Sequence, residues 1–166
     1  SRRLWSVAKD EWTRDLSAFL DIEEEGRAET GLSPLWVEQR FGFPDDTDSL
    51  PPVILTLDDG VEIRFRGVID RVDTGDSGRN VAVTDYKSGS NFSYQDIRDD
   101  PLGAGCHLQL PVYAMAVRDF LGADRDIKSQ YWFVSTSSRY ERKEVPLDDV
   151  ESRFADVTKR IVSGIK

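Results

Sequence analysis

Two stretches decide the fold that this sequence predicts: GVIDRVD at residues 67–73 and NVAVTDYK at residues 80–87. Both are rich in the β-branched residues that strands favour, and both carry charges that the interior of a sheet does not normally keep. The turn between them contains Gly75 and Gly78. We therefore expect the two stretches to pair as a hairpin across Thr74 to Arg79.

The expected hairpin brings two carboxylates and a lysine to one end of the sheet. Asp85 and Lys87 are two residues apart, so their side chains share a strand face with Val81 and Val83, which looks buried. Asp70 and Asp85 are about equally far from the turn, so their carboxylates can meet. Two buried carboxylates repel one another, which favours a divalent cation between them.

The ligand types predict which ion and which chemistry this cluster would serve. Hard carboxylate oxygens select Mg²⁺ or Mn²⁺ over zinc. Such an ion would polarise a phosphoryl oxygen and lower the pKa of an attacking water, while Lys87 orients that water or neutralises developing charge. The pattern thus predicts phosphodiester hydrolysis. The alternative is a surface hairpin whose Asp85 and Lys87 are solvated or paired with Arg71.

The remaining segments predict the layers around the hairpin. We expect a helix at 1–30, a four-strand meander at 33–87, a helix at 102–121, strands at 127–145 and a C-terminal helix at 148–164. The fold class is α/β, a mixed central sheet flanked by helices, in one domain. The first helix has no convincing cap, so we expect a fragment of a longer protein. The four Trp residues are expected in the core.

Composition excludes several classes of protein. The net charge of −9, from 22 basic and 31 acidic residues, argues against binding phosphates by bulk charge. One Cys and one His exclude an internal disulfide, an iron–sulfur cluster held by four Cys and His-rich zinc sites. No apolar run approaches the ~20 residues that span a bilayer, so we expect a soluble intracellular protein without membrane partners.

Three motifs in order resemble a known family: GVIDRVD at 67–73, DYKSG at 85–89 and QLPVY at 109–113. They look like the nuclease domain of the RecB and AddB helicase-nucleases, within the PD-(D/E)xK superfamily, and the match covers roughly residues 35–135. The resemblance implies a restriction-endonuclease-like core and Mg²⁺- or Mn²⁺-dependent cleavage of DNA, as an exonuclease in repair and recombination. It also implies a helicase domain or subunit as partner, in the bacterial cytoplasm and associated with the nucleoid when active.

The resemblance also assigns roles to residues. It makes Asp70 and Asp85 metal ligands, Lys87 the catalytic lysine, and the Tyr86 carbonyl a further ligand.

Other residues would support this site. Gln109 and Tyr113 are four apart, hence on one helix face, and would contact DNA or hold the catalytic groups. Arg71 is a candidate for phosphate contact, and His107 is a candidate because it is close to Gln109.

One departure from the family concerns an upstream metal ligand. The family usually has a His or Glu on an upstream helix, in a Gly-x-x-x-His motif, whereas the only His here, His107, comes after the hairpin. Either that helix was left out of this chain, or an acidic residue replaces it. Glu25, Glu29 and Glu38 are the candidates, and Glu38 in the first strand is preferred.

Two alternatives to an active DNA nuclease stay open. One is a nuclease-fold module without activity that binds DNA or serves for docking to another subunit, and the other is a metal-dependent phosphohydrolase of small molecules. A polar loop at 91–98 carries Phe92 and Tyr94, which could stack on bases. An ordinary surface loop is the alternative there.

Overall fold

A five-stranded mixed sheet forms the centre of the computed structural model, which describes residues 2–145 and 148–164. The strands run in the order β1 (Ser33–Phe41), β4 (Gly67–Thr74), β5 (Asn80–Lys87), β6 (Asp126–Phe133), β7 (Arg142–Val145). β5 and β6 are parallel, and the other neighbours are antiparallel. Parallel β5 and β6 need a long crossover, which contains a helix.

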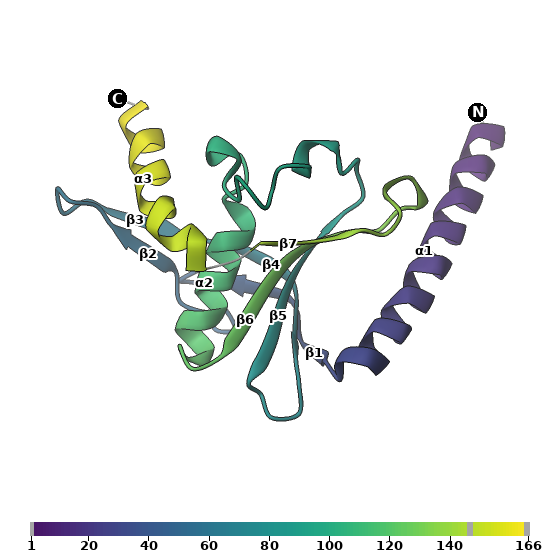
Figure 1. The fold of residues 1–166 in the computed structure, drawn as a ribbon, viewed down its shortest axis with the longest axis horizontal. Coiled ribbons are helices and arrows are strands. Elements are labelled where there is room, and N and C mark those ends of the chain that lie inside the picture. Colours follow the sequence, from purple (N-terminus) through teal and green to yellow (C-terminus); the bar gives the residue numbers. More distant parts are fainter. Residues whose placement is uncertain (1, 146–147, 165–166) are drawn as a thin grey trace.

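Helices flank the sheet on both sides (Figure 1). α1 (Arg2–Thr30) lies on one side, and α2 (Gln109–Leu121) and α3 (Asp148–Gly164) lie on the other. Short 3₁₀ turns occur at η1 (Phe92–Tyr94), η2 (Gly103–Gly105) and η3 (Thr136–Ser138). The predicted fold class, a mixed sheet flanked by helices, is confirmed.

The core lies between the sheet and α2. Every residue of α2 from Leu110 to Val117 is buried, because this helix contacts β5 and β6 on one side and β2 on another. Val81 and Val83 of β5 are buried as predicted. This packing fixes the helix against the strand that carries Asp85.

The predicted four-strand meander is wrong. Residues 33–87 contain five strands, and two of them, β2 (Val53–Thr56) and β3 (Glu62–Phe65), form a separate hairpin. β1 pairs directly with β4. The strand is interrupted at Arg66, since β3 ends at Phe65 and β4 begins at Gly67. Gly67 lies against an aromatic ring, and a Cβ there would be 2.9 Å from Phe41 Cε1. Apolar residues continue to alternate across this interruption, so the alternation in the sequence does not show where β3 ends and β4 begins.

Two further expectations need correction. The helix predicted at 102–121 begins only at Gln109, because Ala104 has a positive φ of 52° and residues 103–105 form a separate turn. Trp5 and Trp12 are not core residues, with 63% and 59% of their surface exposed. They lie on the N-terminal part of α1, which extends past the sheet (Figure 1).

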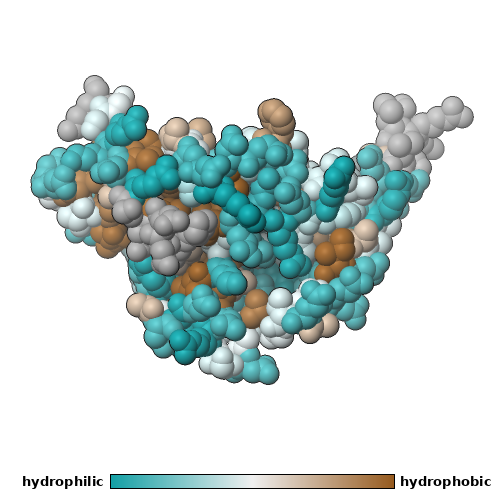
Figure 2. Space-filling model, viewed as in Figure 1, coloured by the Kyte–Doolittle hydropathy of each residue, from teal (hydrophilic) through white to brown (hydrophobic). Residues whose placement is uncertain are grey.

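The surface agrees with the acidic composition. Hydrophilic residues cover most of the face drawn in Figure 2, and the hydrophobic residues appear in separate patches. Among the described residues, no helix is both long enough and apolar enough to cross a bilayer.

Candidate active site

The β4–β5 hairpin forms as predicted and brings Asp70 beside β5. The ladder includes Thr74 opposite Val81 and ends with Arg71 opposite Thr84. Beyond that pair, a side chain replaces the backbone as acceptor. Asp70 Oδ2 accepts a hydrogen bond of 2.8 Å from the backbone amide of Tyr86. The carboxylate thus satisfies an amide that the sheet no longer pairs.

Asp85 is the most deeply buried charge of this cluster, with 1% of its surface exposed. Its Oδ2 forms an ion pair of 2.5 Å with Lys87 Nζ, and among the described residues no further partner of that buried oxygen is found. Burial raises the pKa of Asp85; the ammonium of Lys87 acts in the opposite direction, and the charge of Asp70 raises it further. An incompletely satisfied carboxylate is thus held inside the protein.

A chain of hydrogen bonds holds Lys87 from α2. Lys87 Nζ donates to Gln109 Oε1 at 3.1 Å, and Gln109 Nε2 donates to the Tyr113 hydroxyl at 2.7 Å. The i, i+4 spacing places Gln109 and Tyr113 on one face of α2, as the sequence predicts. Burial raises the pKa of Tyr113, and the charges of Asp85 and Asp70 add to that effect. Tyr113 therefore keeps its proton near neutral pH.

Tyr131 belongs to this site and was missed from the sequence. It lies on β6 directly opposite Asp85, is almost fully buried, and its ring centroid is 5.3 Å from Lys87 Nζ. Burial raises the pKa of Tyr131 above its ordinary value. The alternation of β6 places Tyr131 and Phe133 on one face, but the parallel register that brings this face to Lys87 depends on residues far apart in sequence.

His107 lies in an aromatic stack next to Tyr131. Its ring centroid is 4.5 Å from that of Tyr94 and 6.3 Å from that of Tyr131. The His107 Nε2 lies 3.3 Å from the backbone oxygen of Ser93. His107 therefore packs the loop between β5 and α2 against the sheet.

The family follows from comparison with known proteins. A sequence model of the PD-(D/E)XK nuclease superfamily matches residues 3–166. The chain belongs to this superfamily. The resemblance drawn from the three motifs is therefore confirmed.

Curated relatives include proteins from several bacteria that are named as subunits of an ATP-dependent helicase/deoxyribonuclease. The protein from Symbiobacterium thermophilum is 41% identical over 107 residues, which cover 63% of this chain and 9% of that protein. The protein from Clostridioides difficile is 32% identical over 104 residues, or 61% of this chain and 8% of that protein. The chain thus spans less than a tenth of the relatives that it matches.

Arg71 does not lie beside Asp70, Asp85 and Lys87, which we call the Asp85 cluster. It follows Asp70 directly, so strand alternation turns it to the opposite face of the sheet. There its guanidinium donates to Glu23 Oε1 at 2.7 Å, to Asp73 at 2.6–2.8 Å and to the Tyr86 hydroxyl at 3.2 Å. The proposed phosphate contact of Arg71 would require this buried cluster to come apart.

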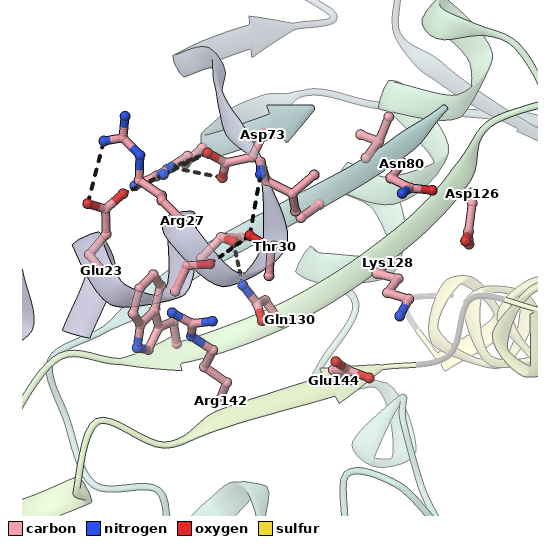
Figure 3. Close-up of a pocket in the computed structure, with 17 residues that line it drawn as sticks. Glu23, Arg27, Thr30, Asp73, Asn80, Asp126, Lys128, Gln130, Arg142 and Glu144 are labelled. Atoms are coloured by element: carbon pink, nitrogen blue, oxygen red, sulfur yellow. Dashed lines mark hydrogen bonds and ion pairs between the residues drawn. The ribbon is translucent and has the colours of Figure 1, made fainter. Parts of the chain in front are cut away.

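A pocket of about 340 Å³ lies on that opposite face, between α1 and the sheet. Figure 3 shows Glu23 and Asp73 at one end and Asn80, Asp126 and Lys128 at the other. Asp70, Asp85 and Lys87 are not among its lining residues. This pocket is therefore separate from the Asp85 cluster.

The structure does not bring the three upstream acidic candidates into a metal cluster. Glu38 lies between Val37 and Gln39, which pair with Arg71 and Ile69 on either side of Asp70, but it is exposed and has a positive φ of 50°. Glu25 and Glu29 are exposed on α1. Within residues 2–145 and 148–164, no three His, Cys, Asp or Glu side chains form a group that could hold a metal ion.

The donors that are present nevertheless fit a hard cation. Mg²⁺ is commonly held by one or two carboxylates and keeps several waters, so Asp70 and Asp85 would be enough side-chain ligands for it. The buried Asp85 Oδ2 lacks a hydrogen bond, as an oxygen reserved for a cation would. The geometry thus agrees with a divalent ion at the end of the β4–β5 hairpin.

Proposed function

We propose that this chain is a metal-dependent nuclease domain that hydrolyses phosphodiester bonds in DNA. The observation that carries the proposal is Asp85 Oδ2, a buried carboxylate oxygen without a hydrogen bond, 2.5 Å from the ammonium of Lys87. Burial of this carboxylate is unfavourable even beside Lys87, and a further cationic ligand would stabilise its charged form. A protein that used the fold only as a platform would have no need of such a carboxylate.

Asp70 and Asp85 would hold the ion, with the Tyr86 carbonyl as a further ligand. A bound Mg²⁺ or Mn²⁺ would supply Lewis-acid chemistry, which stabilises charge on the phosphate and lowers the pKa of a water. Asp70 is already turned toward β5 by its bond to the Tyr86 amide. This bond fixes the carboxylate before any ligand arrives.

Lys87 would act on the reacting phosphate or on its attacking water. Its ammonium lies beside Asp85 and is held at a second point by Gln109 Oε1. A lysine fixed in this way can donate a proton to the water network or neutralise charge on a non-bridging oxygen. Gln109 and Tyr113 orient Lys87 through their hydrogen bonds, and the ammonium of Lys87 lies over the ring of Tyr131.

The names of the relatives support DNA as the substrate and a helicase as the partner. We propose that the chain forms a single nuclease domain of a longer bacterial DNA-repair protein, acts in the cytoplasm at the nucleoid, and digests DNA as an exonuclease. The relatives named helicase/deoxyribonuclease are many times longer than this chain. A motor in the same protein would deliver DNA to a domain whose own charge is −9.

The test is cleavage of end-labelled single- and double-stranded DNA with Mg²⁺ or Mn²⁺. We expect the wild-type chain to cut, and Asp85→Asn and Lys87→Ala to lose cutting. The matched control is Glu62→Gln, because Glu62 and Arg64 form an exposed ion pair of the same i, i+2 spacing on β3. No metal-dependent cutting by the wild-type chain, or equal cutting by Asp85→Asn, would contradict the proposal.

A further inference from the structure

Tyr86 has contacts on both faces of the sheet. Its backbone amide donates to Asp70 Oδ2 at 2.8 Å, within the proposed metal site. Its side chain, one position after Asp85, points to the opposite face, where the hydroxyl accepts a hydrogen bond of 3.2 Å from Arg71 Nη1. One residue therefore connects the metal site with the face that α1 covers (Figure 1).

Aromatic rings hold the Tyr86 side chain between α1 and β6. The ring of Phe19, on α1, meets that of Tyr86 edge to face, with the two centroids 5.7 Å apart. Trp132, which pairs with Tyr86 in the β5–β6 register, has its ring centroid 5.9 Å from that of Tyr86 and 4.7 Å from that of Phe19. Three rings from three elements thus contact one another pairwise, and such aromatic pairs are favourable beyond the area that they bury.

The groups around that ring are themselves fixed. Trp132 is buried, and the guanidinium carbon of Arg142 lies 3.7 Å from its ring centroid. α1 comes so close to this guanidinium that a Cβ at Gly26 would be 2.8 Å from Arg142 Nη2. Glu23, also on α1, accepts a hydrogen bond of 2.7 Å from Arg71 Nη2. The position of α1 on the sheet is therefore defined by ionic as well as aromatic contacts.

The backbone of Tyr86 lies where β5 loses its pairing with β4. The ladder ends with Arg71 opposite Thr84, and the Asp70 carboxylate is the acceptor for the Tyr86 amide. In a strand, the N–H and C=O of one residue point to the same side, so the Tyr86 carbonyl is directed to the side of Asp70 as well. A rotation of this segment would move the amide away from Asp70 and displace the carbonyl that we propose as a metal ligand. The anchored ring opposes that rotation.

We propose that Tyr86 is a positioning residue of the metal site, and that Phe19 of α1 acts through its ring to fix the backbone that links Asp70 to β5. Groups that orient metal ligands from outside the coordination sphere commonly change metal affinity by about 10–100-fold when they are lost. This inference rests on the proposed function, because it names residues that tune the same metal site from the other face of the sheet.

The first test is calorimetric titration of the wild-type chain, Phe19→Ala and Trp12→Ala with Mn²⁺. We expect Phe19→Ala to raise Kd for Mn²⁺ about 10-fold, although the lost ring carries no group that binds a metal ion. Trp12→Ala is the matched control, because Trp12 lies on the same helix and, among the described residues, its one aromatic contact is with Trp5. This control should bind Mn²⁺ like the wild type.

The second test works without metal and measures amide hydrogen exchange by NMR in EDTA. A general loss of stability speeds exchange throughout the sheet, whereas release of the Tyr86 backbone speeds it locally. We expect Phe19→Ala to speed exchange of the Tyr86 amide about 10-fold more than exchange of the amides at 81–84, which lie in the β4–β5 ladder. Phe19→Leu keeps an apolar side chain on α1 and should show the same preference if Phe19→Ala does not fold.

Three results would each overturn the inference: equal Kd values for the wild type and Phe19→Ala, an equal rise in Kd for Trp12→Ala, or uniform acceleration of exchange along β5. Absence of Mn²⁺ binding by the wild-type chain would refute the metal site instead. Exchange of the Tyr86 amide would then decide whether α1 positions it.

Discussion

The buried charged groups on the two faces of the β4–β5 hairpin differ in how many partners they have. On the face toward α1, Arg71 is surrounded by Glu23, Asp73 and the Tyr86 hydroxyl, and its guanidinium bonds to all three. On the face toward α2, Asp85 has one cation beside it, Lys87, and among the described residues its buried Oδ2 makes no hydrogen bond. Neighbouring residues of the same two strands contribute to both clusters: β4 provides Asp70 and Arg71, and β5 provides Asp85 and Tyr86.

Under the proposed function, this difference separates a structural cluster from a functional one. The Arg71 cluster is complete without any ligand, and it ties α1 to the sheet through Glu23. The Asp85 cluster has fewer partners, and under the proposed function a bound cation would complete it. Incomplete pairing of buried charges is a recurrent property of sites that bind ions and perform chemistry.

The largest effect is expected from Asp85→Asn, which should lower the rate of DNA cleavage by at least about 10²–10³-fold. The same substitution removes a buried charge, so it should raise the metal-free melting temperature by about 2–4 °C for each 1 kcal/mol gained. Cleavage assays and thermal denaturation in EDTA measure the two effects. A variant that is both inactive and less stable would place Asp85 among structural residues.

Arg71→Met should show the reverse pattern. It takes the nearest cation from the buried carboxylates of Glu23 and Asp73 and leaves Glu23 with the longer ion pair to Arg27 at 3.6 Å, which should lower the free energy of unfolding by about 3–5 kcal/mol. Chemical denaturation measures this loss. Arg64→Met, which breaks an exposed ion pair on β3, should change the free energy by no more than about 0.5 kcal/mol. If Arg71→Met proved as stable as Arg64→Met, the contrast between the two faces would fail.

A smaller effect is expected at Gln109, which accepts a hydrogen bond from Lys87 and, in the proposed function, positions that lysine. Gln109→Ala should lower kcat by about 10–100-fold, as the loss of outer-shell partners does in metal sites, and change KM less. Gln109→Glu keeps an oxygen acceptor for Lys87 and should recover part of kcat. Equal kinetics for Gln109→Ala and the wild type would show that the hydrogen bond from Lys87 has no role.

The smallest effect concerns pH. Because burial raises the pKa of Asp85, the folded state binds more protons than the unfolded state at pH values above the ordinary pKa of a free Asp, about 3.9. Without metal, the contribution of Asp85 to stability should therefore fall as pH rises from that value through the raised pKa. The difference in unfolding free energy between Asp85→Asn and wild type should grow with pH, and a constant difference would count against the raised pKa.

Local spacing was enough to predict much of the site. The alternation of side chains along a strand predicts that Asp85 and Lys87 share a buried face. The turn with Gly75 and Gly78 predicts the hairpin that brings Asp70 beside them. Helical spacing paired Gln109 with Tyr113. The same alternation also shows that Arg71, adjacent to Asp70, must face the other way, so the expectation that it supports the site neglected a signal present in the sequence.

Features that depend on distant parts of the chain could not be predicted in this way. Tyr131 reaches Lys87 only through the parallel register of β5 and β6, which a crossover of nearly 40 residues separates in sequence. The close approach of Gly67, where β4 begins, to the ring of Phe41 joins two separate strands, and the exposure of Trp12 depends on where the sheet ends relative to α1. Hydrophobic pattern marks a face for burial, but tertiary packing determines what covers it.

The central claim is that Asp70 and Asp85 form a cation site, and calorimetric titration of the chain with Mn²⁺ tests it most directly. We expect one Mn²⁺ to bind the wild-type chain and the Glu62→Gln control with the same affinity, and binding to be lost in Asp85→Asn. Binding of Mn²⁺ to Asp85→Asn as tightly as to the wild type, or no binding to the wild type, would contradict the account.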